Sequence, residues 1–548
     1  MIRNSVRRPL NLLTSLGVAL GLAACSVAPP TRPDRWSPPE AVVPASAFKG
    51  VHGLAVDGQG RLLAGSVVGN AIWEVDRASG ATKVFIGAPQ GQADDIAVGP
   101  GGELAWTAYL QGALHYRERD ETPVRVLASG LPGLNSLAFD RRNGKLYATQ
   151  VFLGDALWEI DVAGQKPPRL IAKDLGGLNG FEVGPDGLIY GPLWFKGQVV
   201  KVDPSNGKVT TINHEFKIPA AANLDGQGHL WVVDTQTGEL SKVELASGRK
   251  TVVQPLNTSI DNLAIAPDGT VYVSNMADNS VQAYDPATGR VRTLTSGKVA
   301  VPGGLEIDGD TLYLADLFAF RQIDVKSGAV RDIFRMHASD MEYPFSLGVS
   351  PHGFALTSWF TGTLQIIDRA TLKTRAMIHG LKAPSDVVWL PDGSLVYAEL
   401  GTGTLTQASG PGFEQRKVIA TGLEGPVQLA LARDGAVYVT EAAGKLWRVM
   451  PGDGSKTVVA SGLALPEGVA PTPWGTVVVA EAAARRLTEI DPATGAKHTV
   501  AEDLPIGFEA GPGMPAPYIP TGVAVGADGT VYFSADRDSG IYRVRPGR

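Results

Sequence analysis

From about residue 50 onward the chain repeats one short pattern, and this repetition limits its possible folds more than any other feature. Examples are "HGLAVDGQGRLLAGS", "DNLAIAPDGTVYVSN" and "TGVAVGADGTVYFSA", which begin at His52, Asp261 and Thr521. Each joins two apolar segments through a turn that ends in glycine, which is typical of a β-hairpin. A third apolar segment and a "DPATG"-type turn follow. The period is about 41 residues over roughly twelve copies, which predicts four-stranded propeller blades.

The number of copies predicts an all-β protein with two tandem six-bladed β-propellers of four-stranded antiparallel blades. One large ring is the alternative. No stretch shows helical periodicity. A propeller hides its edge strands by closing on itself, and the segment "EAVV" (40–43) can serve as a spare strand. We expect it to complete the copy that begins near Asp261, and the segment "RVRTLTS" (290–296) to close the second ring.

The N-terminus predicts export and lipid attachment. Three arginines precede an apolar stretch that leads to "LAAC", ending at Cys25, the only cysteine of the chain. This pattern resembles the lipobox of bacterial lipoproteins, which implies a lipid-modified Cys25 after cleavage. Because Ser26 follows rather than aspartate, the resemblance implies the outer membrane, facing the periplasm. An ordinary signal peptide with a chance cysteine is the alternative.

These features predict four segments. Residues 1–24 form a lipoprotein signal peptide, 25–39 a Pro-rich tether, 40–295 the first propeller and 296–548 the second. The formal charge of −6 argues against nucleic acid as a partner. A membrane reached through Cys25, and either a small-molecule ligand or an envelope protein, are the partners that remain.

One position in each copy, about eight residues before the turn glycine, should lie at the mouth of the central channel. In the first ring this position holds His52, Asp94, Asn135, Asn179, Ala220 and Asp261. In the second ring it holds Gly303, Phe345, Ser385, Val427, Glu467 and Thr521. Polar side chains therefore converge in the first ring, whereas the second ring is mixed. Any one of these polar residues can instead cap backbone groups at a blade-entry turn.

These repeats resemble the regucalcin and gluconolactonase family of six-bladed propellers and, more loosely, NHL-repeat proteins and virginiamycin B lyase. "LNGFEVGPDG" matches the family's metal-binding asparagine motif at Asn179, and "LNSLAF" matches its substrate-binding asparagine at Asn135. The resemblance implies a divalent cation that polarises the carbonyl group of a lactone. Two metal positions of the family differ, because His52 stands where glutamate is expected and Ala220 where aspartate is expected.

In a closed six-bladed ring, Asp261, His52 and Asp94 would be consecutive around the channel mouth. Two carboxylates about 8 Å apart repel by roughly 2 kcal/mol at an effective dielectric near 20, so a cation should offset them. That cation is either protonated His52 or a divalent ion held by Asn179, Asp261 and Asp94. Calcium is our first choice, with zinc or manganese as alternatives. Ala220 would then form an open wall that leaves room for a ligand.

Two classes of function follow. The first is a metal-assisted hydrolase of a small lactone, ester or related carbonyl compound, or a lyase. Its catalytic residues would be His52, Asp94 and Asp261, with Asn135 and Trp194 binding substrate. The second is a non-catalytic propeller scaffold that binds a ligand or a protein in the periplasm. A propeller fold hosts both classes. The acids that end second strands in the second ring, such as Asp316 and Glu481, are expected to bond turn amides.

Overall fold

The computed structural model describes residues 32–511 and 518–547, and this part of the chain is built almost entirely of β-strands. Its strands form twelve antiparallel sheets of four strands each. Two short 3-10 turns, Tyr109–Gln111 and Ala482–Ala484, are the helical elements of the described residues. No described helix has the length and apolar character to cross a membrane. The all-β fold with four-stranded blades is confirmed.

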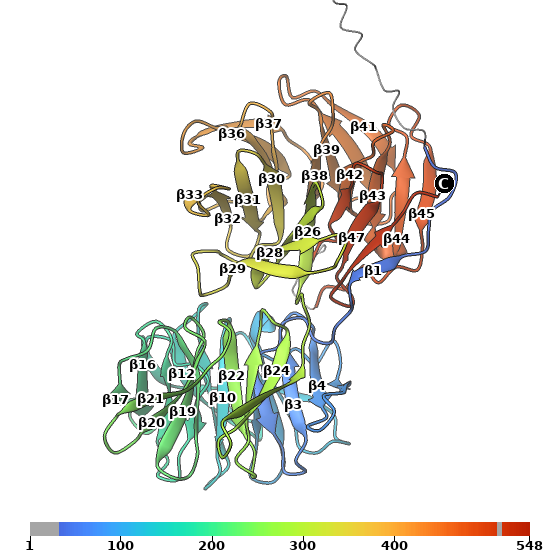
Figure 1. Cartoon of the computed structure of the whole chain (residues 1–548). Helices are drawn as coiled ribbons and strands as arrows, with labels where there is room; N and C mark the ends of the chain where they lie inside the picture. Colours follow the sequence, from blue (N-terminus) through green and yellow to red (C-terminus); the bar gives the residue numbers. More distant parts are fainter. Residues whose placement is uncertain (1–31, 512–517, 548) are drawn as a thin grey trace, which may run out of the picture.

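The twelve blades form two rings, which Figure 1 shows one above the other. The first ring contains six blades, at residues 54–86, 96–128, 134–173, 182–213, 219–255 and 260–295. The second ring contains blades at residues 302–335, 346–378, 384–420, 426–461, 466–501 and 523–544. A single large ring is excluded, because the innermost strands of each set of six contact one another in a closed circle.

The innermost strand of each blade lines the channel. In the first ring these strands are β2 (Leu54–Val56), β6 (Ile96–Val98), β10 (Leu134–Asp140), β14 (Glu182–Val183), β18 (Pro219–Leu224) and β22 (Ile260–Ile265). In the second ring they are β26 (Pro302–Asp308), β30 (Ser346–Ser350), β34 (Pro384–Trp389), β38 (Pro426–Leu431), β42 (Pro466–Pro471) and β46 (Val523–Val525).

The spare strand closes the opposite ring from the one expected. β1 (Glu40–Val43) pairs with β48 (Gly540–Val544), so the prediction that "EAVV" completes the first propeller is wrong. The sixth blade already has its own outer strand, β25 (Arg290–Thr295), paired with β24 (Ser280–Asp285). Figure 1 shows β1, in blue, within the yellow-to-red ring.

Side-chain contacts explain the choice. The Glu40 carboxylate accepts hydrogen bonds from Arg543, with Nη2 to Oε1 at 2.8 Å, and from Arg545. Val42 and Val43 pack with Ile541 and Leu314 in one apolar cluster. Residues 40–43, which we assigned to the first propeller, therefore belong to the second, and the chain enters and leaves that ring at the same blade.

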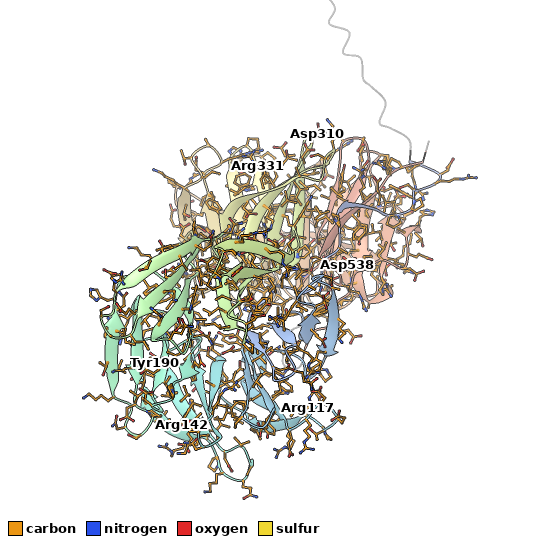
Figure 2. All side chains as sticks on the ribbon, turned by 60° about the horizontal axis from the view of Figure 1, so that its bottom comes forward. Arg117, Arg142, Tyr190, Asp310, Arg331 and Asp538 are labelled. Atoms are coloured by element: carbon orange, nitrogen blue, oxygen red, sulfur yellow. The ribbon has the colours of Figure 1, made fainter. Side chains whose placement is uncertain are left out.

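The two rings meet through a mixed apolar and polar junction. One apolar cluster contains Val68 and Met276 of the first ring together with Phe318 and Met341 of the second. Ser259 Oγ donates a hydrogen bond to the Met336 carbonyl at 3.0 Å. Figure 2 draws the side chains of both rings, with Asp538 of the second ring labelled near the first ring. The mouth of the first ring is therefore covered by the second ring.

The predicted signal peptide and Cys25 lie outside the described residues. Lipid attachment and the envelope location therefore stay predictions of the sequence.

Candidate functional site between the two rings

A cavity of about 110 Å³ lies between the mouth of the first ring and the loops of the second. The first ring contributes the polar part of its wall, and the second ring contributes mostly aromatic and aliphatic side chains. Six sequence-predicted residues line this cavity: His52, Asp94, Asn135, Asn179, Trp194 and Asp261. The structure brings these six residues together in one wall.

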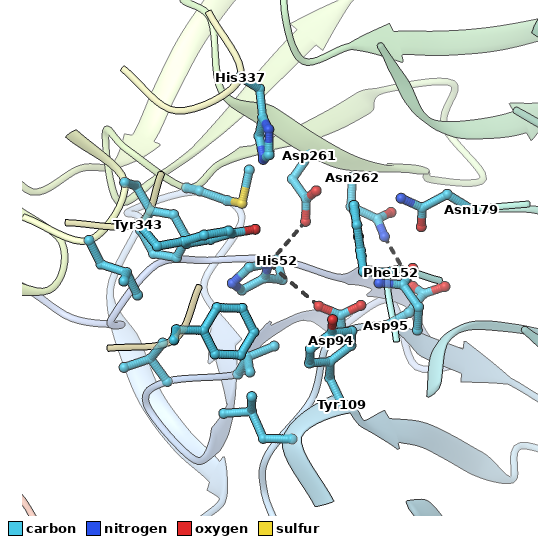
Figure 3. A pocket seen from close by; sticks show the side chains of 18 of the residues that line it. His52, Asp94, Asp95, Tyr109, Phe152, Asn179, Asp261, Asn262, His337 and Tyr343 are labelled. Atoms are coloured by element: carbon cyan, nitrogen blue, oxygen red, sulfur yellow. Dashed lines mark hydrogen bonds and ion pairs between the residues drawn. The ribbon is translucent and has the colours of Figure 1, made fainter. Parts of the chain in front are cut away.

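His52 is held between two carboxylates of neighbouring blades. Its Nδ1 atom lies 3.2 Å from Asp261 Oδ2 and 3.6 Å from Asp94 Oδ1. Figure 3 shows the imidazole with both acids on the same side. His52 and Asp94 come two residues before the inner strands β2 and β6, and Asp261 is the second residue of β22. The closed ring therefore places the three residues on neighbouring blades.

Burial and charge act in opposite directions on this group. Burial disfavours the imidazolium form, but the hydrogen bond with Asp261 and the charges of Asp261 and Asp94 outweigh it, and the pKa of His52 rises above 6.5. Burial also raises the pKa of Asp94 well above its usual value. The nearby Asp261 and Asp95 charges add to that rise, while His52 opposes it. The protonation of Asp94 therefore depends on the charge of His52.

The second ring nitrogen of His52 has a different environment. Nε2 is buried and has no hydrogen-bond partner among the described residues. The ring packs edge-on against Phe318, with centroids 5.6 Å apart. An Nδ1–H bonded to Asp261 leaves the Nε2 lone pair free, which is the arrangement of a general base with its orienting carboxylate.

The two predicted asparagines are joined by a serine that the index position did not include. Ser136 Oγ lies 2.8 Å from Asn179 Oδ1 and 2.9 Å from Asn135 Oδ1. The backbone N–H of Gly180 also donates to Asn179 Oδ1, at 2.9 Å. The Asn179 carbonyl oxygen is thus already occupied by two donors within the protein.

This arrangement does not fit the predicted metal set. Asp94 and Asp261 face His52 Nδ1, whereas the Asn179 oxygen faces Ser136 and Gly180. Among residues 32–511 and 518–547, no group of three or more His, Cys, Asp or Glu side chains is arranged to hold a metal ion. We therefore derive no chemical step through a metal, and the cation remains a prediction for experiment.

Ala220 does not form an open wall, so that part of the sequence interpretation is wrong. The residue is only 1% exposed and packs in an apolar cluster that also contains Trp194, Trp231 and Ile260. Trp194 itself lines the cavity and lies edge-on to His337, with ring centroids 4.9 Å apart. An indole therefore occupies the side that the missing carboxylate leaves free.

The sequence analysis missed a second layer of polar residues directly below the first. Asp95 accepts a hydrogen bond from Asn262 Nδ2 at 3.1 Å, and burial raises the pKa of Asp95 to about 7. The pair reaches across Gly53, where a Cβ atom would lie 2.6 Å from the Asp95 Cα. Irregular pairing at the start of β22, between Ile260 and Leu263, lets Asp261 and Asn262 both face the channel.

The sequence analysis also missed the aromatic roof. The loop between β29 (Val330–Arg335) and β30 brings His337 and Tyr343 over the channel mouth, and both have left-handed backbone conformations, with φ of 64° and 36°. Figure 3 shows the hydroxyl groups of Tyr343 and of Tyr109, from the first ring, directed toward the acidic cluster. Burial raises the pKa of both tyrosines, so their hydroxyl groups stay protonated as donors.

His337 contrasts with His52 in its protonation. Burial lowers the pKa of His337 to about 4, and the charge of Asp261 only partly opposes this effect. Within the described part of the chain, the His337 ring donates no hydrogen bond to a carboxylate that would offset this desolvation. At neutral pH this histidine is therefore an uncharged part of the roof.

Comparisons with known proteins give one partial family match and distant structural similarities. A family model described as outer membrane protein assembly factor BamB matches residues 188–295. A streptogramin B lyase structure is 14% identical, with a TM-score of 0.26, covering 60% of this chain and 93% of that one. Virginiamycin B lyase from Staphylococcus aureus is 14% identical, with a TM-score of 0.28, covering 60% of this chain and 94% of that one. No curated protein matches the chain.

The twelve four-stranded sheets and their two closed circles define the class of this chain. It is a β-propeller protein whose described residues form two six-bladed rings with a cavity between them. The comparisons do not carry the specific features of gluconolactonases to this chain.

Proposed function

We propose that this protein is an envelope-anchored enzyme that hydrolyses a small ester or lactone in the cavity between its two rings. The observation that carries the proposal is the state of His52. Its Nδ1 is bonded to Asp261, and its buried Nε2 is free of any partner among the described residues. A histidine held in this way in a shielded cavity is prepared to accept a proton.

The chemistry follows from this geometry. Nε2 of His52 takes a proton from a water molecule as the water oxygen bonds to the carbonyl carbon. The ester C–O bond then breaks, and the leaving alkoxide takes that proton from His52. One water is consumed, and an acid and an alcohol are formed, or one hydroxy acid from a lactone. Asp261 orients the imidazole and stabilises its charged form. The protonation of Asp94 changes with the charge of His52.

Hydroxyl and amide groups supply the remaining polar contacts. Tyr109 and Tyr343 can donate hydrogen bonds to the carbonyl oxygen as negative charge develops on it. Asn135 lines the same wall and can position the substrate. The apolar residues of the roof exclude water, which strengthens each of these interactions.

The test is turnover of a panel of esters and lactones by the wild type and by His52→Gln. We expect the variant to lose about 10²- to 10⁴-fold in kcat/KM, the usual contribution of a general base. Ser385→Ala is the control, because Ser385 holds a channel-mouth position in the third blade of the second ring and does not line the cavity. Equal loss in both variants, or full activity in His52→Gln, contradicts the proposal.

The predicted cation has a separate test. Metal analysis of the wild type and Asp261→Ala, after dialysis against divalent cations, shows whether an ion binds at this cluster. An ion that is present in the wild type and lost in the variant would replace the metal-free mechanism. If no panel compound is converted with folding intact, the scaffold alternative takes its place.

A further inference from the structure

A group of large apolar side chains, most of them aromatic, lies at one edge of the cavity, and all but the buried Trp194 are exposed. We call it the aromatic rim and define it as Phe152, Leu153, Trp194, Phe195 and Phe360. Phe152 is 42% exposed, Leu153 53%, Phe195 56% and Phe360 37%. Exposed large apolar residues are ordinary when scattered, but a contiguous group marks a contact surface.

Three aromatic members from the first ring contact one another, and Phe360 of the second ring is linked to them through His337 and Tyr343. The Phe152 ring lies edge-on to Trp194 at 5.3 Å and to Phe195 at 5.6 Å between centroids. Phe360 of the second ring lies edge-on to Tyr343 at 5.4 Å. Phe152, Trp194 and Phe360 also line the cavity that contains His52. The rim is therefore an outward continuation of the cavity wall.

Phe152 is held in an unfavourable conformation. Its φ of 68° lies in the left-handed region, which costs a bulky residue about 1–3 kcal/mol. This strain does not bury the side chain, since Phe152 remains well exposed. A tight turn around Phe152, closed by a hydrogen bond from the Leu153 N–H to the Val151 carbonyl at 2.9 Å, holds the phenyl ring at the cavity edge.

We propose that the substrate is amphiphilic, an ester or lactone whose alkyl tail lies along the aromatic rim while its carbonyl group lies at His52. The nature of the carbonyl group rests on the proposed function, whereas the tail rests on the rim alone. The tail is the occupant because the rim is continuous with the cavity, so one molecule reaches both. His52, Asp94 and Asp261 inside the cavity favour the polar head of the ligand. The five apolar residues of the rim favour its alkyl tail.

The size of the effect follows from the hydrophobic contribution of each methylene group. Burying one CH₂ contributes about 0.8 kcal/mol, which corresponds to about a fourfold change in affinity. Affinity should therefore rise by up to about fourfold per carbon until the tail extends beyond the rim. A ligand confined to the closed cavity would instead lose affinity once its tail became too long.

The experiment uses binding rather than turnover. Calorimetry measures the Kd of a homologous series of N-alkyl amides, which carry a carbonyl group but resist hydrolysis, below their micelle-forming concentrations. The proteins are the wild type, Phe195→Ala, Phe152→Ala and His52→Gln. Leu372→Ala is the matched control, because Leu372 is 43% exposed with φ of 55° but does not line the cavity.

We expect the wild type, His52→Gln and Leu372→Ala to show the same rise in affinity with tail length. Phe195→Ala and Phe152→Ala should both reduce the rise in affinity per carbon of the tail. Phe195 does not have a left-handed backbone conformation, so Phe195→Ala still tests the proposal if Phe152→Ala fails to fold. No dependence on tail length in the wild type, or an unchanged dependence in Phe195→Ala, overturns the proposal. A preserved dependence without any turnover would reject the hydrolase and keep the amphiphile site.

Discussion

The two rings share one architecture, yet they use equivalent positions for opposite purposes. At the channel mouth the first ring presents His52, Asp94 and Asp261 to a cavity, whereas the second ring presents Phe345 as part of the apolar roof. The second ring has many buried acids too, but several are bonded to its own backbone. Glu481 Oε2, for example, accepts the Ala464 N–H at 2.8 Å. Asp386, Glu441 and Asp536 of the second ring also keep a buried oxygen without a hydrogen-bond partner among the described residues, but unlike His52 they do not line the cavity.

Two histidines show the same contrast at closer range. His52 and His337 lie near Asp261 but come from different rings, and His52 is buried whereas His337 is half-buried. The hydrogen bond to Asp261 raises the pKa of His52 against the effect of burial, while burial alone dominates for His337. The difference is the hydrogen bond: Asp261 is bonded to His52, whereas only its charge acts on His337.

The largest effect expected from this contrast is a loss of stability in acid that depends on His337. Its pKa is about 4 in the folded protein and near 6.5 when exposed. As pH falls below 6.5, the unfolded state binds the proton first, so the free energy of unfolding decreases by up to about 3 kcal/mol on approaching pH 4. Urea unfolding of the wild type and His337→Gln at neutral and acidic pH measures it.

The relevant quantity is the difference between the two proteins at each pH. Asp261, His52, Trp194 and Tyr343 surround His337 in both, so their contributions largely cancel. Loss of the Trp194 contact adds a constant penalty to the variant. A difference that does not change with pH would contradict the assigned environment of His337.

A smaller effect should follow from the polar contact that joins the rings. Arg335 of β29 donates to Asp278 Oδ1 and to the Thr258 carbonyl, both at 2.8 Å, and lies beside the loop that supplies His337 and Tyr343. We expect Arg335→Met to lower the free energy of unfolding by about 2 kcal/mol, since charged hydrogen bonds contribute about 1.5–3 kcal/mol. Urea unfolding measures this change, and turnover should fall with it.

Arg448→Met is the control for that variant. Arg448 pairs with Asp434 on the surface of the second ring alone, so its removal should change stability by about 0–1 kcal/mol. Equal effects of the two substitutions would mean that the rings do not depend on each other.

Much of the fold could be predicted from the sequence, because each blade is a local unit whose strands are adjacent along the chain. The exception is instructive. β1 is a short apolar segment that could close either ring, and only its distant partners Arg543 and Ile541 decide between them. The four residues of β1 do not themselves indicate a partner strand about 500 residues further along the chain.

The candidate site could be predicted only in part, for a similar reason. The repeat spacing located His52, Asp94 and Asp261, since these positions recur in every blade. The roof depends on how one ring docks on the other, and nothing in the repeat indicates that His337 and Tyr343 would lie over His52. The layer formed by Asp95 and Asn262 could not be predicted, because it depends on the irregular pairing at the start of β22.

The most direct test of the account is a titration of the histidine side chains by NMR. The chain has eight histidines, so ¹⁵N-labelled wild type is compared with His52→Gln and His337→Gln to assign the two signals. We predict that His52 titrates above pH 6.5, with Nδ1 protonated in its neutral form, while His337 stays neutral down to about pH 4. Asp261→Asn should move the His52 titration to lower pH. A His52 that titrates at or below 6.5, or that ignores Asp261→Asn, would contradict the account.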